Sequence, residues 1–132
     1  MQNDDKPLLL FIDDEIFLLN AYRRMFRQSQ WRCLFCTTTV EAAQLLDLYP
    51  VQLILCDYYL TEGTGEEFYL GLADKFRHVK RILLSGSNEV LTEQLISSGV
   101  VDKVLHKPCT KAELISLIDS CLGSVHRCSE YE

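Results

Sequence analysis

Five short apolar segments alternate with stretches of helical periodicity along this chain. The segments cover residues 8–12, 33–36, 51–57, 79–84 and 101–105. The third is the most informative, because a continuous apolar run that ends in a carboxylate, Asp57, is typical of a strand buried on both faces of a parallel sheet. Parallel neighbours need crossover helices, and right-handed crossovers place helices on both sides of the sheet. The pattern therefore predicts a three-layer α/β domain with a parallel five-stranded sheet.

The stretches between these strands carry the signals of amphipathic helices. The first repeats apolar residues at helical intervals on one face: Leu18, Leu19, Tyr22, Met25 and Phe26. Three later stretches begin with a threonine three residues before a glutamate, which is the spacing of a capping box: Thr38, Thr64 and Thr110.

Two of these helices carry more detailed expectations. The helix after Thr64 is expected to bury three apolar side chains: Phe68, Leu72 and Phe76. A helix over residues 88–98 is expected to end at Gly99, where a left-handed cap is needed. Its inward side chains are expected to be Leu91, Leu95 and Ile96.

Length and charge limit the class of protein. With 132 residues the chain fits one domain, which we expect over residues 7–122 between tails at 1–6 and 123–132. Nineteen acidic residues against thirteen Lys and Arg give a net charge of −6, which works against direct binding to nucleic acid. No apolar run reaches the roughly 18 residues of a membrane span, and the polar start does not resemble a signal peptide. These features favour a cytoplasmic protein without a membrane partner.

Six cysteines raise the question of a metal or disulfide framework. Cys33 and Cys36 have the spacing of half a zinc site, but on a strand two positions three apart point to opposite faces, and no second Cys/His pair follows. Cys56, Cys109 and Cys121 lie in or beside apolar segments and are interpreted as small buried hydrophobic residues. Reduced thiols agree with a cytoplasmic location.

Polar side chains follow four of the five predicted strands. They are Asp13 and Asp14 after the first, Asp57 after the third, Ser85 after the fourth and Lys107 after the fifth. A single acid at a strand end is as typical of a turn or a helix cap. Because open parallel sheets bind ligands outside the carboxyl ends of their strands, the set as a whole predicts a site at this edge.

These residue types point to phosphoryl chemistry. Three converging carboxylates would repel one another unless a hard cation or a lysine offset their charge. Carboxylate and carbonyl oxygens favour Mg²⁺, which also binds phosphate oxygens. Lys107 and the Ser85 hydroxyl would hold the remaining phosphoryl oxygens, and Asp57 is the natural nucleophile for an aspartyl-phosphate.

Four motifs in this order resemble the receiver domains of bacterial two-component response regulators. They are Phe11-Ile12-Asp13-Asp14-Glu15, the strand that ends at Asp57, Ile82-Leu83-Leu84-Ser85-Gly86, and Leu105-His106-Lys107-Pro108. The similarity covers roughly residues 7–122. It implies a (βα)5 flavodoxin-like fold whose sheet has the order 2-1-3-4-5, with a cis bond between Lys107 and Pro108.

The resemblance also implies a function. A histidine kinase or a histidine phosphotransfer protein would pass a phosphoryl group to Asp57. Mg²⁺ would be held by Asp14, Asp57 and the backbone carbonyl of Tyr59, with Asp13 assisting. Such a domain is a phosphoacceptor that takes part in its own phosphorylation and dephosphorylation and is not an enzyme in the usual sense. It switches binding to a downstream effector, and related domains often form homodimers through the face of helix 4, strand 5 and helix 5.

Some positions depart from the family pattern. Val104 stands where the family usually has an aromatic switch residue, so the output would have to travel through backbone shifts of the loop after Ser85. Thr61 stands where the family commonly has proline, which predicts a more mobile Gly63-Thr64-Gly65 loop. Tyr59 and Ser87 should flank the phosphoryl group, and Tyr59 either screens it from water or is a surface tyrosine beside the site.

Two other functions compete with this interpretation. A haloacid dehalogenase type of phosphohydrolase needs a second acid two residues after its nucleophile, and that position is Tyr59 here. A pseudo-receiver that serves only as a protein-interaction module is the stronger alternative. The acid, hydroxyl and lysine positions of the site are all filled, which favours a competent phosphoacceptor.

Overall fold

The structure is a computed structural model, and it describes residues 6–86 and 92–123. The main sheet in this part of the chain has five strands: β1 (Leu8–Ile12), β2 (Arg32–Cys36), β3 (Leu53–Asp57), β6 (Lys80–Ser85) and β7 (Lys103–His106). A separate hairpin consists of β4 (Tyr59–Leu60) and β5 (Gly63–Thr64). The helices are α1 (Ile16–Met25), α2 (Thr39–Leu48), α3 (Gly65–Leu70), the 3-10 turn η2 (Asp74–Phe76), α4 (Thr92–Ser97) and α5 (Lys111–Leu122).

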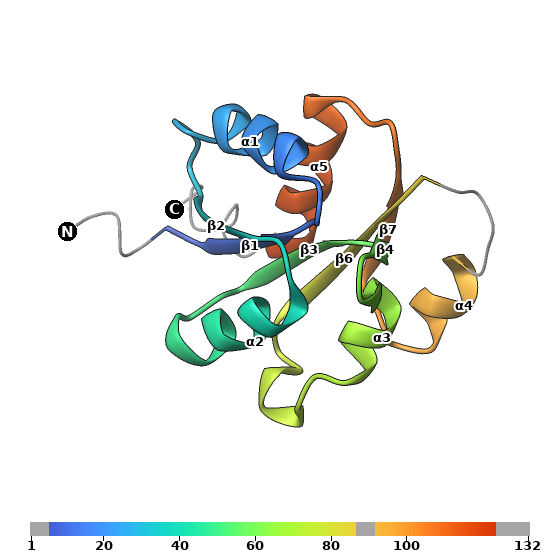
Figure 1. Ribbon diagram of the computed structural model, residues 1–132. Coiled ribbons are helices and arrows are strands. Elements are labelled where there is room, and N and C mark those ends of the chain that lie inside the picture. Colours follow the sequence, from blue (N-terminus) through green and yellow to red (C-terminus); the bar gives the residue numbers. More distant parts are fainter. Residues whose placement is uncertain (1–5, 87–91, 124–132) are drawn as a thin grey trace, which may run out of the picture.

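All neighbours in the main sheet are parallel, and their order is β2-β1-β3-β6-β7. Since β6 and β7 are the fourth and fifth strands of this sheet along the chain, the order is the predicted 2-1-3-4-5. Helices α1 and α5 cover one face, and α2, α3 and α4 cover the other (Figure 1). The predicted three-layer arrangement is confirmed.

Strand alternation divides the interior into two apolar clusters. On β1, the side chains of Leu8, Leu10 and Ile12 pack in the cluster beneath α2, α3 and α4, whereas Leu9 and Phe11 pack in the cluster beneath α1 and α5. All five are buried. The sequence of β1 is therefore a continuous apolar run because helices cover both faces of the sheet.

The three helix starts predicted at threonine caps are confirmed, whereas the predicted start at residue 88 lies outside the described residues. The Thr64 and Thr110 side chains each accept a hydrogen bond from the backbone N–H of the third residue of the following helix. The Glu67 and Glu113 carboxylates in turn accept one from the backbone N–H of the capping threonine. Thr38 accepts from the Glu41 backbone and caps α2. These bonds satisfy backbone N–H groups that have no partner inside the helix.

Two predictions of inward side chains need correction. Helix α3 ends at Leu70, and Phe68, Leu72 and Phe76 are only partly buried. The fully buried side chain of α3 is Tyr69, whose hydroxyl donates to the Ile82 carbonyl at 2.6 Å. This bond removes the cost of burying a phenol, which is why an apolar pattern did not identify it.

On α4, Leu95 is buried as predicted, but Ile96 is 40% exposed. The described helix covers only Thr92–Ser97, and Leu95 is the residue of this short helix that is buried. Gly99 has a φ of +84°, as expected for a left-handed cap. Leu91 lies outside the described residues, as do most of the predicted tails at 1–6 and 123–132.

The cysteine interpretation holds for the strand pair. Cys33 packs in the cluster beneath α1 and α5, and Cys36 in the opposite cluster. Burial raises the pKa of both thiols to about 12, which disfavours the thiolate form that a metal needs. Cys56 is buried, whereas Cys109 and Cys121 are only partly so, and the described cysteines are free of disulfides. Within residues 6–86 and 92–123, none of the helices combines the length and apolar character required to cross a bilayer.

Gly65 fixes the approach of α3 to the end of β3. A Cβ atom at this position would lie 2.6 Å from the Asp57 carbonyl oxygen and 2.7 Å from the Leu83 side chain. The Gly65 N–H donates to the Tyr58 carbonyl at 2.7 Å. The backbone that carries Asp57 is therefore held in place by a helix start that only glycine allows.

We predict that Gly65→Ala destabilises the fold by about 1–3 kcal/mol, because the added methyl group forces the end of β3 and α3 apart. Gly71→Ala is the matched control, since its Cβ would meet only ordinary contacts at 3.5 Å and beyond. Urea unfolding of the two variants measures the difference. Equal stability of Gly65→Ala and the native chain would contradict this account of the packing.

Candidate functional site

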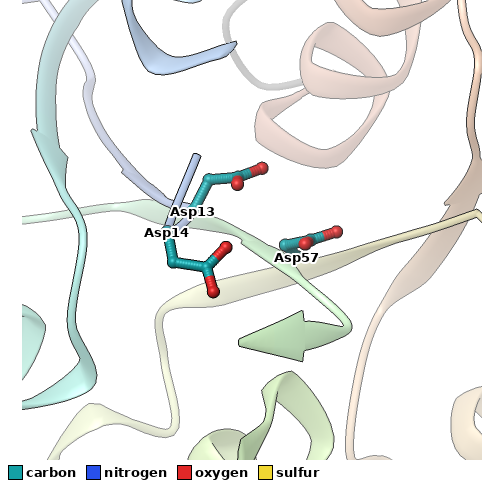
Figure 2. Close-up of side chains that lie close together, drawn as sticks. All are labelled: Asp13, Asp14 and Asp57. Carbon is teal, nitrogen blue, oxygen red and sulfur yellow. The ribbon is translucent and has the colours of Figure 1, made fainter. Parts of the chain in front are cut away.

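Three carboxylates gather at the carboxyl edge of the sheet. Asp13 and Asp14 directly follow β1, and Asp57 is the last residue of β3. These strands are parallel neighbours, so their ends meet at the same edge. Each residue offers a carboxylate oxygen within 4.8 Å of the others, and Figure 2 shows the three side chains converging from the two segments.

Lys107 extends into this cluster from the end of β7, the outermost strand beyond β6. It follows β7, and its backbone N–H donates to the Ser85 carbonyl at 2.7 Å. Its ammonium nitrogen lies 2.9 Å from Asp57 Oδ1 and 3.5 Å from Asp13 Oδ2. The cis peptide bond that was implied between Lys107 and Pro108 is present. Four of the five predicted side chains thus meet as expected.

Asp13 is the most buried member of the cluster, with a relative exposure of 1%. Its Oδ1 atom accepts a hydrogen bond from the Glu15 backbone at 2.9 Å. Its Oδ2 atom receives no hydrogen bond from the described residues, and its contact with Lys107 is an ion pair without hydrogen-bond geometry. Burial is the main cause that raises the pKa of Asp13, and the neighbouring Asp57 and Asp14 charges add to it.

Asp57 and Lys107 form the central ion pair of the site. Burial raises the pKa of Asp57, although the hydrogen bond and charge of Lys107 oppose this effect. Burial alone would lower the pKa of Lys107, but the hydrogen bond and charge of Asp57, together with Asp13, raise it. Lys107 therefore stays a cation and offsets part of the negative charge of the cluster.

Asp14 has a partner that the sequence did not reveal. The Thr61 hydroxyl, between β4 and β5, donates to Asp14 Oδ2 at 2.6 Å. In the sequence, Thr61 stands out only as a departure from the family pattern. Its contact with a residue 47 positions away depends on the β4–β5 hairpin, whose two-residue strands are too short to give a sequence signal.

The remaining predicted positions are placed as follows. Ser85 ends β6 and is partly buried. Tyr59 is 64% exposed and packs edge-on against Tyr58, with ring centroids 4.7 Å apart. Val104 pairs in register with Leu83 and packs, partly buried, against the cluster beneath α2, α3 and α4. Ser87 and most of the loop after Ser85 lie outside the described residues.

The donor set fits a hard divalent cation. It consists of carboxylate oxygens from two segments, and one of them, Asp13 Oδ2, is buried with the 3.5 Å ion pair to Lys107 as its polar contact among the described residues. A buried acceptor of this kind is uncommon in folded proteins unless an ion or a water serves it. Oxygen ligands of this charge are those that Mg²⁺ prefers.

Comparison with known proteins agrees with this geometry. A family model described as the response regulator receiver domain matches residues 9–119. The hydrogenase transcriptional regulatory protein HoxA of Cupriavidus necator is 29% identical over 133 residues, which cover 95% of this chain. The chain spans only 27% of the length of that relative.

Solved structures share the fold at low identity. The signal receiver domain of an HD domain-containing protein from Pseudomonas fluorescens Pf-5 has a TM-score of 0.81 at 23% identity, covering 94% of this chain and 98% of that one. The chemotaxis protein CheY4 of Vibrio cholerae has a TM-score of 0.80 at 15% identity, covering 88% and 98%. The flavodoxin-like fold expected from the sequence is confirmed.

We predict that, without divalent cations, Asp13→Asn is more stable than the native chain at neutral pH. The pKa of Asp13 is raised in the folded state, so the folded native chain binds its proton more tightly than the unfolded chain does. Native stability should therefore fall as pH rises from the ordinary aspartate range through the raised value. Asparagine does not titrate, so the advantage of the variant should grow across this interval and then level off.

Urea unfolding in chelator-containing buffer at a series of pH values measures this effect. The difference in unfolding free energy between Asp13→Asn and the native chain is the quantity to follow. A difference that stays constant across the interval would mean that Asp13 does not carry the cost of the crowded carboxylates.

Proposed function

This chain belongs to the response regulator receiver domain family, and we propose that its Asp57 accepts a phosphoryl group from a phosphohistidine donor in a magnesium-dependent reaction. The observation that carries the proposal is the ion pair between Asp57 and Lys107, formed beside two further carboxylates at one edge of the sheet. A nucleophile, a cation for the phosphoryl oxygens and a set of oxygen ligands are thus within reach of one another.

The chemistry follows from the side chains. A carboxylate oxygen of Asp57 attacks the phosphorus atom, the phosphorus–nitrogen bond to the donor imidazole breaks, and an acyl phosphate forms on Asp57. The Lys107 ammonium, now beside Asp57 Oδ1, transfers its contact to a phosphoryl oxygen. The Ser85 hydroxyl, at the end of the neighbouring strand, binds a second phosphoryl oxygen.

Asp14, Asp57 and the backbone carbonyl of Tyr59 would hold Mg²⁺, with Asp13 assisting. When bound, Mg²⁺ supplies positive charge against the carboxylates and the phosphoryl oxygens. Lys107 by itself offsets only one of the three clustered negative charges. The domain is then a phosphoacceptor whose own side chains assist both its phosphorylation and its dephosphorylation, and not an enzyme that turns over a separate substrate.

The partners follow from this role. A histidine kinase or histidine phosphotransfer protein would donate the phosphoryl group, and an effector domain or protein would respond. HoxA is a transcriptional regulatory protein more than three times as long as the aligned part, so a further output domain on this protein is one form the effector could take. The net charge of −6 argues that the receiver itself does not contact nucleic acid, and we place it in the cytoplasm.

Signal output uses a face without the usual aromatic switch. Val104 on β7 has a β-branched side chain with few rotamers, so phosphorylation would act through backbone shifts of the loop after Ser85. The face formed by α4, β7 and α5 would then change. A homodimer through this face is the assembly that we propose for the phosphorylated state.

We predict that acetyl phosphate with Mg²⁺ adds one phosphoryl group to the native chain, as measured by intact mass spectrometry. Asp57→Asn should abolish the addition because it removes the nucleophile, and a chelator should suppress it. Asp47→Asn, which alters an exposed aspartate on α2, is the matched control and should be phosphorylated like the native chain. A native chain that takes up no phosphoryl group would favour the alternative function, a pseudo-receiver that acts only as an interaction module.

We predict that Tyr59→Ala shortens the life of the phosphorylated state several-fold. Tyr59 lies two residues beyond the phosphoacceptor, and its exposed ring packs edge-on against Tyr58. From this position the ring can limit the approach of water to the phosphoryl group. Loss of the phosphoryl group over time, followed on a phosphate-affinity gel, measures the rate. Tyr49→Ala, another exposed tyrosine, is the control, and an unchanged rate in Tyr59→Ala would mean that the ring is only a surface contact.

A further inference from the structure

The hydrogen bond between Thr61 and Asp14 joins the candidate metal site to the β4–β5 hairpin. At 2.6 Å between Thr61 Oγ1 and Asp14 Oδ2, it is a short bond from a hydroxyl to a carboxylate. It engages one oxygen of Asp14 and leaves Oδ1 for another ligand. A hydroxyl at this distance can restrict the rotamers of the carboxylate.

Asp14 needs such a restraint more than its neighbours do. Asp13 is buried and bonded to the Glu15 backbone, and Asp57 is held by Lys107. Asp14 is only partly buried, and the like charges of Asp13 and Asp57 favour its turning outward to water. A donor on the hairpin opposes that movement and keeps the Asp14 oxygen within 4.8 Å of the other two carboxylates.

The hairpin is itself anchored, so Thr61 is a fixed donor. Tyr59 pairs with Thr64, and Leu60 pairs with Gly63. Leu60 is buried, with 8% of its surface exposed. Glu62, next to Thr61, accepts a hydrogen bond from the Thr39 backbone at the start of α2 at 3.3 Å. Thr61 is therefore held both by the pairing of β4 with β5 and by the hydrogen bond of its neighbour Glu62 to α2.

We propose that Thr61 is a positioning residue that holds Asp14 ready to bind a divalent cation. This inference rests on the proposed function, because it takes Asp14 as a ligand of Mg²⁺. Partners that orient a metal ligand in this way typically contribute 10- to 100-fold to metal affinity. Because Thr61 is exposed, the lower end of that range applies, and the loss of its hydroxyl should weaken Mg²⁺ binding by about tenfold.

Titration of the unphosphorylated chain with MgCl2, followed by amide chemical shifts, tests the proposal. Thr61→Val removes the hydroxyl and keeps the side-chain shape, and it should raise the dissociation constant for Mg²⁺ about tenfold. Thr61→Ser restores the hydroxyl and should bind like the native chain. Thr39→Val makes the same change on α2, keeps the backbone N–H that Glu62 binds, and should also bind like the native chain.

A second readout separates positioning from general loss of structure. Mg²⁺ that binds only the folded state raises the thermal midpoint by an amount that depends on its affinity. Thr61→Val should show a smaller Mg²⁺-dependent rise than Thr61→Ser, whatever the midpoints without metal. If Thr61→Val binds Mg²⁺ as tightly as the native chain, or more tightly, the positioning role of Thr61 is overturned. The proposal that Asp57 is phosphorylated would stand in that case.

The two hypotheses can fail separately. A native chain that binds Mg²⁺ but takes up no phosphoryl group from acetyl phosphate would refute the proposed function, while the comparison of Thr61→Val with Thr61→Ser would still decide the role of Thr61. A native chain that binds no Mg²⁺ would overturn the positioning role together with the magnesium dependence.

Discussion

The balance of charge at the carboxyl edge of the sheet is the constraint on which this structure depends. Three carboxylates whose oxygens lie within 4.8 Å of one another are offset, in the part of the chain that the structure describes, by one ammonium group, that of Lys107. Burial makes the imbalance more costly, as the raised pKa of both Asp13 and Asp57 indicates. A site with an excess of buried negative charge is suited to bind cations, and a metal ion would relieve this excess in the phosphoryl transfer that we propose.

The fold produces this imbalance from simple parts. Parallel pairing of β1 with β3 brings the two acidic segments to one edge, and β6 and β7 carry Ser85 and Lys107 to the same edge. Helices on both faces bury the strands, so their ends cannot move independently. Gly65 lets α3 press against the Asp57 backbone, and Thr61 ties the hairpin to Asp14. The Gly65 contact restricts the backbone of Asp57, and the Thr61 contact restricts the side chain of Asp14.

The main sheet and most of the site could be predicted because their signals are periodic or positional. Apolar runs located the strands, and polar residues at the ends of four of the five strands located the site. The burial of Tyr69 could not be predicted, because it depends on a hydroxyl that meets the Ile82 carbonyl across the fold. The contact of Thr61 with Asp14 was also hidden, because it arises from two-residue strands that leave no pattern.

The central claim is that Asp57 becomes an acyl phosphate, and reductive trapping tests it most directly. Borohydride reduces an acyl phosphate to an alcohol far faster than it reduces a free carboxylate, so a phosphorylated aspartate becomes homoserine. Peptide mass spectrometry of the chain treated with acetyl phosphate, Mg²⁺ and then borohydride should find homoserine at position 57 and at no other aspartate. An intact Asp57, or reduction at Asp13 or Asp14 in its place, would contradict this account.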